Sequence, residues 1–139
     1  KIVYSGVGKT KEEISYALNN NILCFNVESE EDLMAINKQA TLMKVIADIS
    51  IRVNPDVETK THPYISTGMK ENKFGIPYDD ALAIFKKAHK LSSLNILGID
   101  FHIGSQIMST APYLESISSV KTLYSKFFTF IFIMDKAFS

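Results

Sequence analysis

Arg52, His102 and Ser105 are the residues best suited to chemistry, because each lies at or just after the end of an apolar, strand-like run. Arg52 is the only arginine in the chain. A guanidinium cannot give up its charge, so an arginine inside a strand requires an anionic partner. That partner is either the phosphate or carboxylate of a ligand or an acid of the chain such as Glu28 or Asp100, and the spacing leaves both alternatives open.

His102 is the candidate for a catalytic side chain. Gly104 and Ser105 follow it, and a glycine lets the backbone approach a ligand while a hydroxyl and free amides can donate hydrogen bonds to an anion. An imidazole at this place could stack on a flat cofactor ring or transfer a proton. A histidine satisfied within the core is the alternative. His62 and His89 have no ligand-like spacing to His102, so the sequence predicts no metal site.

The charge balance argues against nucleic acid as a partner. The 139 residues include 15 basic and 15 acidic side chains, and no stretch gathers the basic ones on one face. Residues 127–134 form an uncharged, aromatic-rich run, which is far shorter than the roughly 20 residues of a membrane span. We therefore expect a small-molecule site, without nucleic-acid or membrane binding.

Cys24 is the only cysteine, and it lies in an apolar run. It has no second thiol with which to form an intrachain disulfide, so a reducing, cytoplasmic setting is expected. A lone cysteine in a strand-like run is usually a small buried hydrophobic residue. We expect that role for Cys24 rather than a catalytic one.

Apolar, β-branched runs alternate with segments of helical period, which is typical of an α/β fold with a parallel sheet. Thr10 and Glu13 form a capping box, Ser29 is a second helix cap, and Pro112 suits the first turn of a later helix. Strands are expected over residues 2–5, 22–27, 45–53 and 96–103, with a fifth over 127–134, and helices after Thr10, after Ser29, over 79–90 and from Pro112. Residues 54–78 form a connection longer than a plain crossover needs, which predicts a working loop.

The predicted strands place their polar ends at a common edge. In parallel β/α architectures, reactive groups come from the C-terminal ends of the strands, where loops and helix N-termini converge. Here the strands end in Ser5, Glu28, Arg52 and His102. We therefore expect these side chains to lie along one rim of the sheet.

Several ordered segments of the chain resemble those of diaminopimelate decarboxylases. The match runs from residue 1 to about residue 115, and the order of the segments makes it specific. The segments are residues 2–10, Phe25-Asn26-Val27-Glu28-Ser29, Arg52-Val53-Asn54-Pro55, residues 61–68, Lys73-Phe74-Gly75-Ile76 and His102-Ile103-Gly104-Ser105-Gln106.

The resemblance implies a partial (β/α)8 TIM barrel of the alanine-racemase-like group, with about the third to sixth strands present. Residues 1–139 would form a single, partial barrel domain. Its residues 1–115 are family-like, whereas residues 126–139 read as a divergent apolar tail. The second, β domain of the group has no counterpart in this sequence.

The same resemblance implies pyridoxal 5′-phosphate (PLP) as cofactor and meso-diaminopimelate as substrate, decarboxylated to L-lysine by a homodimer when the protein is full length. Carried over residue by residue, His102 would stack against the PLP ring and Ser105 would lie near its phosphate. Arg52 would lie beside the cofactor and influence its electrostatics, and Lys73 would lie near the mouth of the site.

The family's cofactor-binding lysine lies on the first barrel strand, and none of the fourteen lysines here occupies a matching string. We therefore expect the chain alone to be inactive, as a truncated, frameshifted or degraded copy. Two alternatives stay open: a decarboxylase of the same group that acts on arginine or ornithine, and a non-catalytic PLP-binding or structural remnant. Residues 61–68 and Gln106 favour diaminopimelate.

Overall fold

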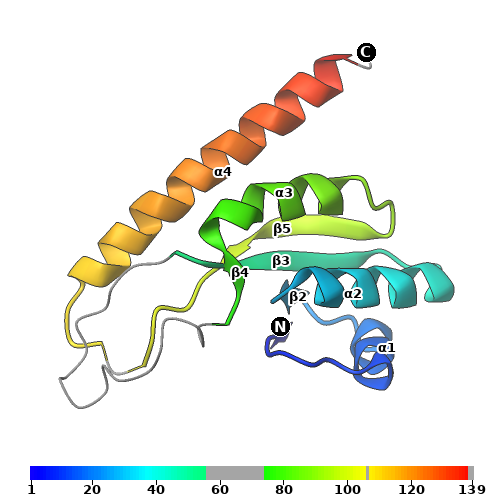
Figure 1. Cartoon of the computed structure of the whole chain (residues 1–139). Helices are drawn as coiled ribbons and strands as arrows, with labels where there is room; N and C mark the ends of the chain where they lie inside the picture. Colours follow the sequence, from blue (N-terminus) through cyan, green and yellow to red (C-terminus); the bar gives the residue numbers. More distant parts are fainter. Residues whose placement is uncertain (56–73, 106, 138–139) are drawn as a thin grey trace.

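The computed structural model describes residues 1–55, 74–105 and 107–137, with the side chains described as far as residue 130. Within these ranges the chain forms a parallel sheet with helices packed against it (Figure 1), as the alternating pattern predicted. The elements in order are β1 (Val3–Tyr4), α1 (Lys11–Asn19), β2 (Cys24–Val27), α2 (Glu30–Met43), β3 (Ala47–Asn54), β4 (Ile76–Pro77), α3 (Tyr78–His89), β5 (Leu94–Asp100) and α4 (Ala111–Ala137).

Strand β3 is the centre of the sheet. It pairs with β2 along Ile49–Ile51, with β5 from Ala47 to Arg52, and at its end with the short strand β4, all in parallel. The sequence did not predict β4, because two residues are too few to show a period. The long pairing of β3 with β5 brings residues almost fifty positions apart side by side.

Two helices begin at the caps that the sequence predicted. Thr10 accepts a hydrogen bond from the Glu13 amide, and the Glu13 carboxylate accepts one from the Thr10 amide at 2.9 Å, which completes the capping box of α1. Ser29 accepts a hydrogen bond from the Asp32 amide at the start of α2. Leu33, the first apolar residue of α2 to face inward, is fully buried.

The two faces of β3 differ in chemistry because successive side chains of a strand point to opposite sides. Ile49, Ile51 and Val53 are buried with apolar side chains of α1, α2 and α3 in one hydrophobic core. Ser50 and Arg52 alternate with them and therefore lie on the opposite, polar face. The helices cover the apolar face, and this arrangement leaves the polar side chains of the strands free to form contacts across the sheet.

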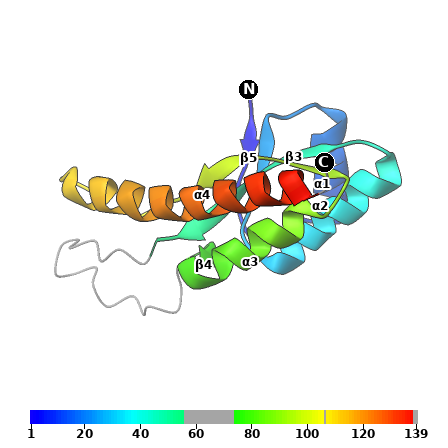
Figure 2. The same ribbon diagram turned by 90° about the horizontal axis from the view of Figure 1, so that it is seen from above.

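The predicted fifth strand over residues 127–134 is wrong, because α4 continues through this run to Ala137. Aromatic and β-branched residues favour strands, but no glycine or proline interrupts the helix after Pro112. Ser116, Leu123 and Phe127 recur at helical spacing on the buried face. Figures 1 and 2 show α4 lying along α3 instead of adding to the sheet.

Cys24 is a buried, free thiol, as the sequence predicted. Burial raises the pKa of the thiol, and the nearby carboxylates of Asp48 and Asp100 raise it further. Since the thiolate is the reactive form, this environment disfavours nucleophilic chemistry at Cys24. Within the described residues, no helix has the length and apolar character needed to span a membrane.

Candidate functional site

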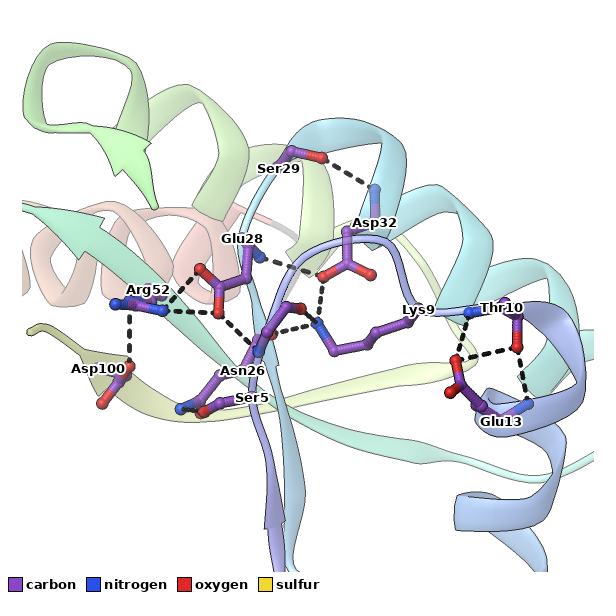
Figure 3. A network of polar contacts seen from close by, with 11 residues as sticks. Ser5, Lys9, Thr10, Glu13, Asn26, Glu28, Ser29, Asp32, Arg52 and Asp100 are labelled. Atoms are coloured by element: carbon purple, nitrogen blue, oxygen red, sulfur yellow. Dashed lines mark hydrogen bonds and ion pairs between the residues drawn. The ribbon is translucent and has the colours of Figure 1, made fainter. Parts of the chain in front are cut away.

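A row of charged side chains crosses the C-terminal ends of three neighbouring strands (Figure 3). Glu28 follows β2, Arg52 lies near the end of β3, and Asp100 is the last residue of β5. The sheet register sets the row, because Arg52 stands directly opposite Asp100 and Val27 stands opposite Ile51. Glu28 and Arg52 are among the strand ends that the sequence predicted to share a rim, whereas Asp100 was expected only as a possible acidic partner of Arg52.

Arg52 is bound chiefly to Glu28. Its Nη1 atom donates hydrogen bonds to both carboxylate oxygens of Glu28 at 2.8 Å, while its Nε atom lies 3.8 Å from Oδ2 of Asp100. The Glu28 side chain is 1% exposed and that of Arg52 is 13% exposed, so the pair is removed from water. Of the two alternatives for an anionic partner of Arg52, the structure therefore shows acids of the chain itself.

One buried N–H group of the Arg52 side chain has no hydrogen-bond acceptor among the described residues. Its Nε atom is buried and has no hydrogen-bond partner among the described residues, since Asp100 is too distant for a hydrogen bond. A buried donor without an acceptor costs about 1 to 3 kcal/mol, so it marks a place where a further acceptor would be stabilising. The rim therefore retains hydrogen-bonding capacity toward a ligand despite the ion pair.

Asp100 has a raised pKa. Burial is the largest cause and the Glu28 carboxylate adds to it, whereas the charges of Arg52 and His102 act in the opposite direction. The side chain of His102 is exposed. Of the predicted site residues, Arg52 therefore lies in the charged row, and His102 follows two positions after its last member, Asp100.

The raised pKa of Asp100 predicts a pH dependence of stability. Because the folded protein binds this proton more tightly than the unfolded chain, the free energy of unfolding falls as the pH rises from the ordinary carboxyl value of 3.8 through the raised pKa. Asp100→Asn cannot ionise and should flatten this part of the curve. Urea denaturation of both proteins across the acidic range measures the effect. Parallel curves for the two proteins would contradict the assignment.

Ser105 is not brought into the charged row. It is exposed, and in the described part of the chain no hydrogen bond joins it to Arg52 or His102. Gly104, with a φ of 132°, turns the backbone between them. The predicted roles of Lys73, residues 61–68 and Gln106 fall on positions outside the described residues.

A second group of polar contacts supports the row, and the sequence did not reveal it. The Lys9 ammonium donates hydrogen bonds to the carbonyl oxygens of Gly6 and Asn26 and to Oδ2 of Asp32 (Figure 3). The Gly6 amide in turn donates to Oε1 of Glu28 at 2.9 Å. A lysine that ends the segment Gly6-Val7-Gly8-Lys9 was the visible signal, but its partners in β2 and α2 could not be read from spacing.

Gly75 packs directly against Arg52. Its φ is 99°, in the left-handed region, and a Cβ atom at this position would lie 3.1 Å from the Arg52 carbonyl oxygen and 3.3 Å from its Cγ atom. Both the conformation and the close approach therefore require glycine here. This packing gives a physical reason for glycine in the Lys-Phe-Gly segment, which the sequence connected to the site by resemblance alone.

Gly75→Ala is expected to destabilise the protein by about 1 to 3 kcal/mol, through left-handed strain and overpacking against Arg52. Gly6→Ala is a matched control, because Gly6 also has a positive φ but no atom lies within 4 Å of its added Cβ. Urea denaturation of both variants separates strain, which they share, from the contact, which only Gly75→Ala makes. Equal losses would show that the contact with Arg52 contributes nothing.

A hollow of about 670 Å³ lies between β1 and α1. Its lining is mainly apolar, with Ile2, Tyr4, Tyr16 and Ile22 among the contributing residues. No basic side chain lines it. A phosphorylated ligand therefore has no charge partner there, and the rim at Arg52 fits such a ligand better.

Most of the chain matches one family model. Residues 1–135 match the pyridoxal binding domain of pyridoxal-dependent decarboxylases. The curated relatives include the diaminopimelate decarboxylases of Vibrio cholerae, 51% identical over 88% of this chain, and of Pseudomonas aeruginosa, 47% identical over 91% of this chain. The chain spans only 30% of the length of each of these relatives.

Solved structures agree with the sequence comparison. Diaminopimelate decarboxylase from Helicobacter pylori, complexed with L-lysine, is 45% identical and superimposes with a TM-score of 0.85 over 93% of this chain and 33% of its own. Lysine decarboxylase from Selenomonas ruminantium is 26% identical, with a TM-score of 0.72 over 89% of this chain and 30% of its own. These likenesses bear out the predicted α/β fold as part of a barrel domain.

The donor set at the rim suits the cofactor that the family name implies. The unpartnered Nε of Arg52 lies at the strand ends, and the imidazole of His102 and the hydroxyl of Ser105 are exposed beyond β5. A phosphorylated, flat, partly anionic ring needs donors and an aromatic face, which these residues can supply. From the agreement of fold and sequence, the chain belongs to the family of pyridoxal-dependent decarboxylases, as part of their pyridoxal binding domain.

Proposed function

We propose that this chain is the PLP-binding barrel segment of a diaminopimelate decarboxylase, which converts meso-diaminopimelate to L-lysine. The observation that carries the proposal is the identity of about half of the residues to relatives of that name, together with the lower identity, 26%, to a lysine decarboxylase structure. Solved relatives that were complexed with L-lysine support a lysine-forming reaction.

We assign the cofactor contacts to Arg52, His102 and Ser105. The imidazole of His102 is exposed beside the row and offers a flat face for stacking, and it is also our candidate for a catalytic side chain. The Ser105 hydroxyl can donate to a phosphate oxygen. Arg52, held by Glu28, keeps a fixed positive charge at the rim. PLP, when bound, accepts the electron pair that the departing carbon dioxide leaves behind.

The segment is proposed to act within a longer protein. We assign residues 1–139 to one partial barrel domain, in which residues 1–115 carry the family features and residues 126–139 diverge. A homodimer in the cytoplasm is the proposed working form, with Lys73 near the mouth of the site. The lysine that binds the cofactor covalently is assigned to a part of the longer protein outside these residues.

Substrate choice is tested by incubating the longer protein, loaded with PLP, separately with meso-diaminopimelate, L-arginine and L-ornithine. Released carbon dioxide and the amine products are measured. We expect L-lysine from meso-diaminopimelate and at least tenfold slower release from the other two. Faster release from arginine or ornithine would favour the related decarboxylases, and no release with any substrate would favour the non-catalytic remnant.

The place of covalent attachment is tested by reducing the PLP-loaded protein with borohydride and mapping the labelled lysine by mass spectrometry. We expect the label outside residues 1–139. A stoichiometric label on one of the fourteen lysines of this chain would contradict the assignment. The same digestion without PLP is the control for nonspecific signals.

A further inference from the structure

Among the described lysines, Lys9 has the most complete set of hydrogen bonds to the protein. Its side chain is 1% exposed, and its ammonium donates to the Gly6 carbonyl at 2.7 Å, to the Asn26 carbonyl at 2.8 Å and to Oδ2 of Asp32 at 2.6 Å. An ammonium has three donors, so none is left for a ligand. Lys9 therefore acts on its protein neighbours rather than on a bound molecule.

Asp32 connects Lys9 to the backbone of Glu28 through one carboxylate oxygen. The same Oδ2 atom that binds Lys9 also accepts a hydrogen bond from the Glu28 backbone amide at 3.1 Å. The backbone of Asp32 is itself fixed, because its amide donates to the Ser29 hydroxyl that caps α2. The loop after β2 is thus tied to the first turn of α2 just where Glu28 leaves the sheet.

The carboxylate of Glu28 is fixed by hydrogen bonds as well as its backbone amide. Its Oε1 atom accepts the Gly6 amide, and the Gly6 carbonyl binds Lys9, so the loops after β1 and β2 form a closed set of contacts (Figure 3). Glu28 then binds Arg52 through both carboxylate oxygens. Lys9 and Asp32 are therefore connected to the carboxylate that binds the guanidinium, through Gly6 and the Glu28 backbone.

We propose that Lys9 and Asp32 are positioning residues for the cofactor, which set the place of Arg52 through Glu28. The role in placing the cofactor rests on the proposed function. The coupling of Lys9 and Asp32 to Arg52 does not depend on that function. A buried ion pair is often replaceable by apolar side chains without loss of stability. The double variant Lys9→Met/Asp32→Leu removes both charges and the acceptor for the Glu28 amide, and so separates folding from positioning.

Because Arg52 is the only arginine, its NMR signal measures the coupling between Arg52 and the pair Lys9 and Asp32 directly. In the 139-residue chain labelled with ¹⁵N, only Arg52 contributes an arginine Nε–H signal to the NMR spectrum. We expect the double variant to retain cooperative urea unfolding but to shift this signal and speed its exchange with water by about tenfold or more. An unchanged signal in the folded double variant would overturn the proposal.

Lys87→Met is the matched control. Lys87 also pairs with a carboxylate at the start of α2, Glu30, but this pair is exposed and has no contact with Glu28. Its loss should leave the Arg52 signal unchanged. A shift as large as that of the double variant would mean that any change near α2 disturbs Arg52, and would contradict a specific route through Asp32.

The same variants in the longer decarboxylase test the purpose of the coupling. We expect the double variant to bind PLP about ten- to a hundredfold more weakly and to lower kcat more than it raises KM, because misplaced groups act at the reacting centre. Its PLP absorption band should also move. Normal PLP affinity, spectrum and kinetics in the variant would overturn the inference, whereas a wild-type protein without PLP binding or carbon dioxide release would instead refute the proposed function.

Discussion

Glu28→Ala is expected to destabilise the protein by about 3 to 5 kcal/mol, because it leaves a buried guanidinium without its main partner. Arg52 donates to both carboxylate oxygens of Glu28 at 2.8 Å, and the remaining acid, Asp100, lies 3.8 Å from Nε and is partly exposed. Asp100 can therefore compensate only weakly. Urea denaturation at neutral pH measures the change in the free energy of unfolding.

Glu115→Ala is the control for loss of a carboxylate. Glu115 is exposed on α4 and forms no ion pair within the described residues, so its replacement should change stability by no more than about 0.5 kcal/mol. Glu28→Gln should fall between the two, because an amide retains an acceptor for the Arg52 guanidinium but not the charge. A loss below about 1 kcal/mol for Glu28→Ala would contradict a buried, essential pair.

Phe127→Ala is expected to destabilise the protein by about 3 to 5 kcal/mol through the cavity that it leaves. Phe127 is 5% exposed, and its ring packs against that of Phe85 on α3 with centroids 4.4 Å apart. This contact joins α4 to the rest of the core. Thermal or urea unfolding followed by circular dichroism measures the loss, and the helical signal reports on α4.

Phe128→Ala provides the neighbouring comparison. Phe128 is 59% exposed, so removal of its ring should change stability by about 0.5 kcal/mol or less. Leu123→Ala, one helical turn before Phe127 on the same buried face, should resemble Phe127→Ala. If the losses at Phe127 and Phe128 were equal, the orientation of α4 against α3 would be wrong.

The sequence predicted the elements whose signals are local. Capping at Thr10 and Ser29 depends on residues within three positions, and the buried face of α2 follows one helical period. Whether residues 127–134 form a helix or a strand depended on contacts with residues that are distant in the sequence. Their strand-like composition conflicted with an unbroken helical period from Pro112 onward, and packing against α3 decided for the helix.

The sequence identified Arg52 as a charged residue that needs a partner, but it did not determine that partner. Arg52 was identified from its charge and its apolar neighbours, yet the choice between a ligand and an acid of the chain needed the sheet register. That register places Asp100 opposite Arg52, and the loop after β2 brings Glu28 to the same point. Lys9 and Asp32 escaped notice because their contacts span 23 residues and involve backbone carbonyls.

We propose that the row of Glu28, Arg52 and Asp100, followed in the chain by His102, lines the cofactor site. A crystal structure of the longer protein with bound PLP tests this placement. We predict that the PLP ring contacts His102 and that Arg52, still paired with Glu28, lies at the same site. A structure in which PLP binds away from the strand ends, with Arg52 and His102 facing separate surfaces, would show that the charged row does not line the cofactor site.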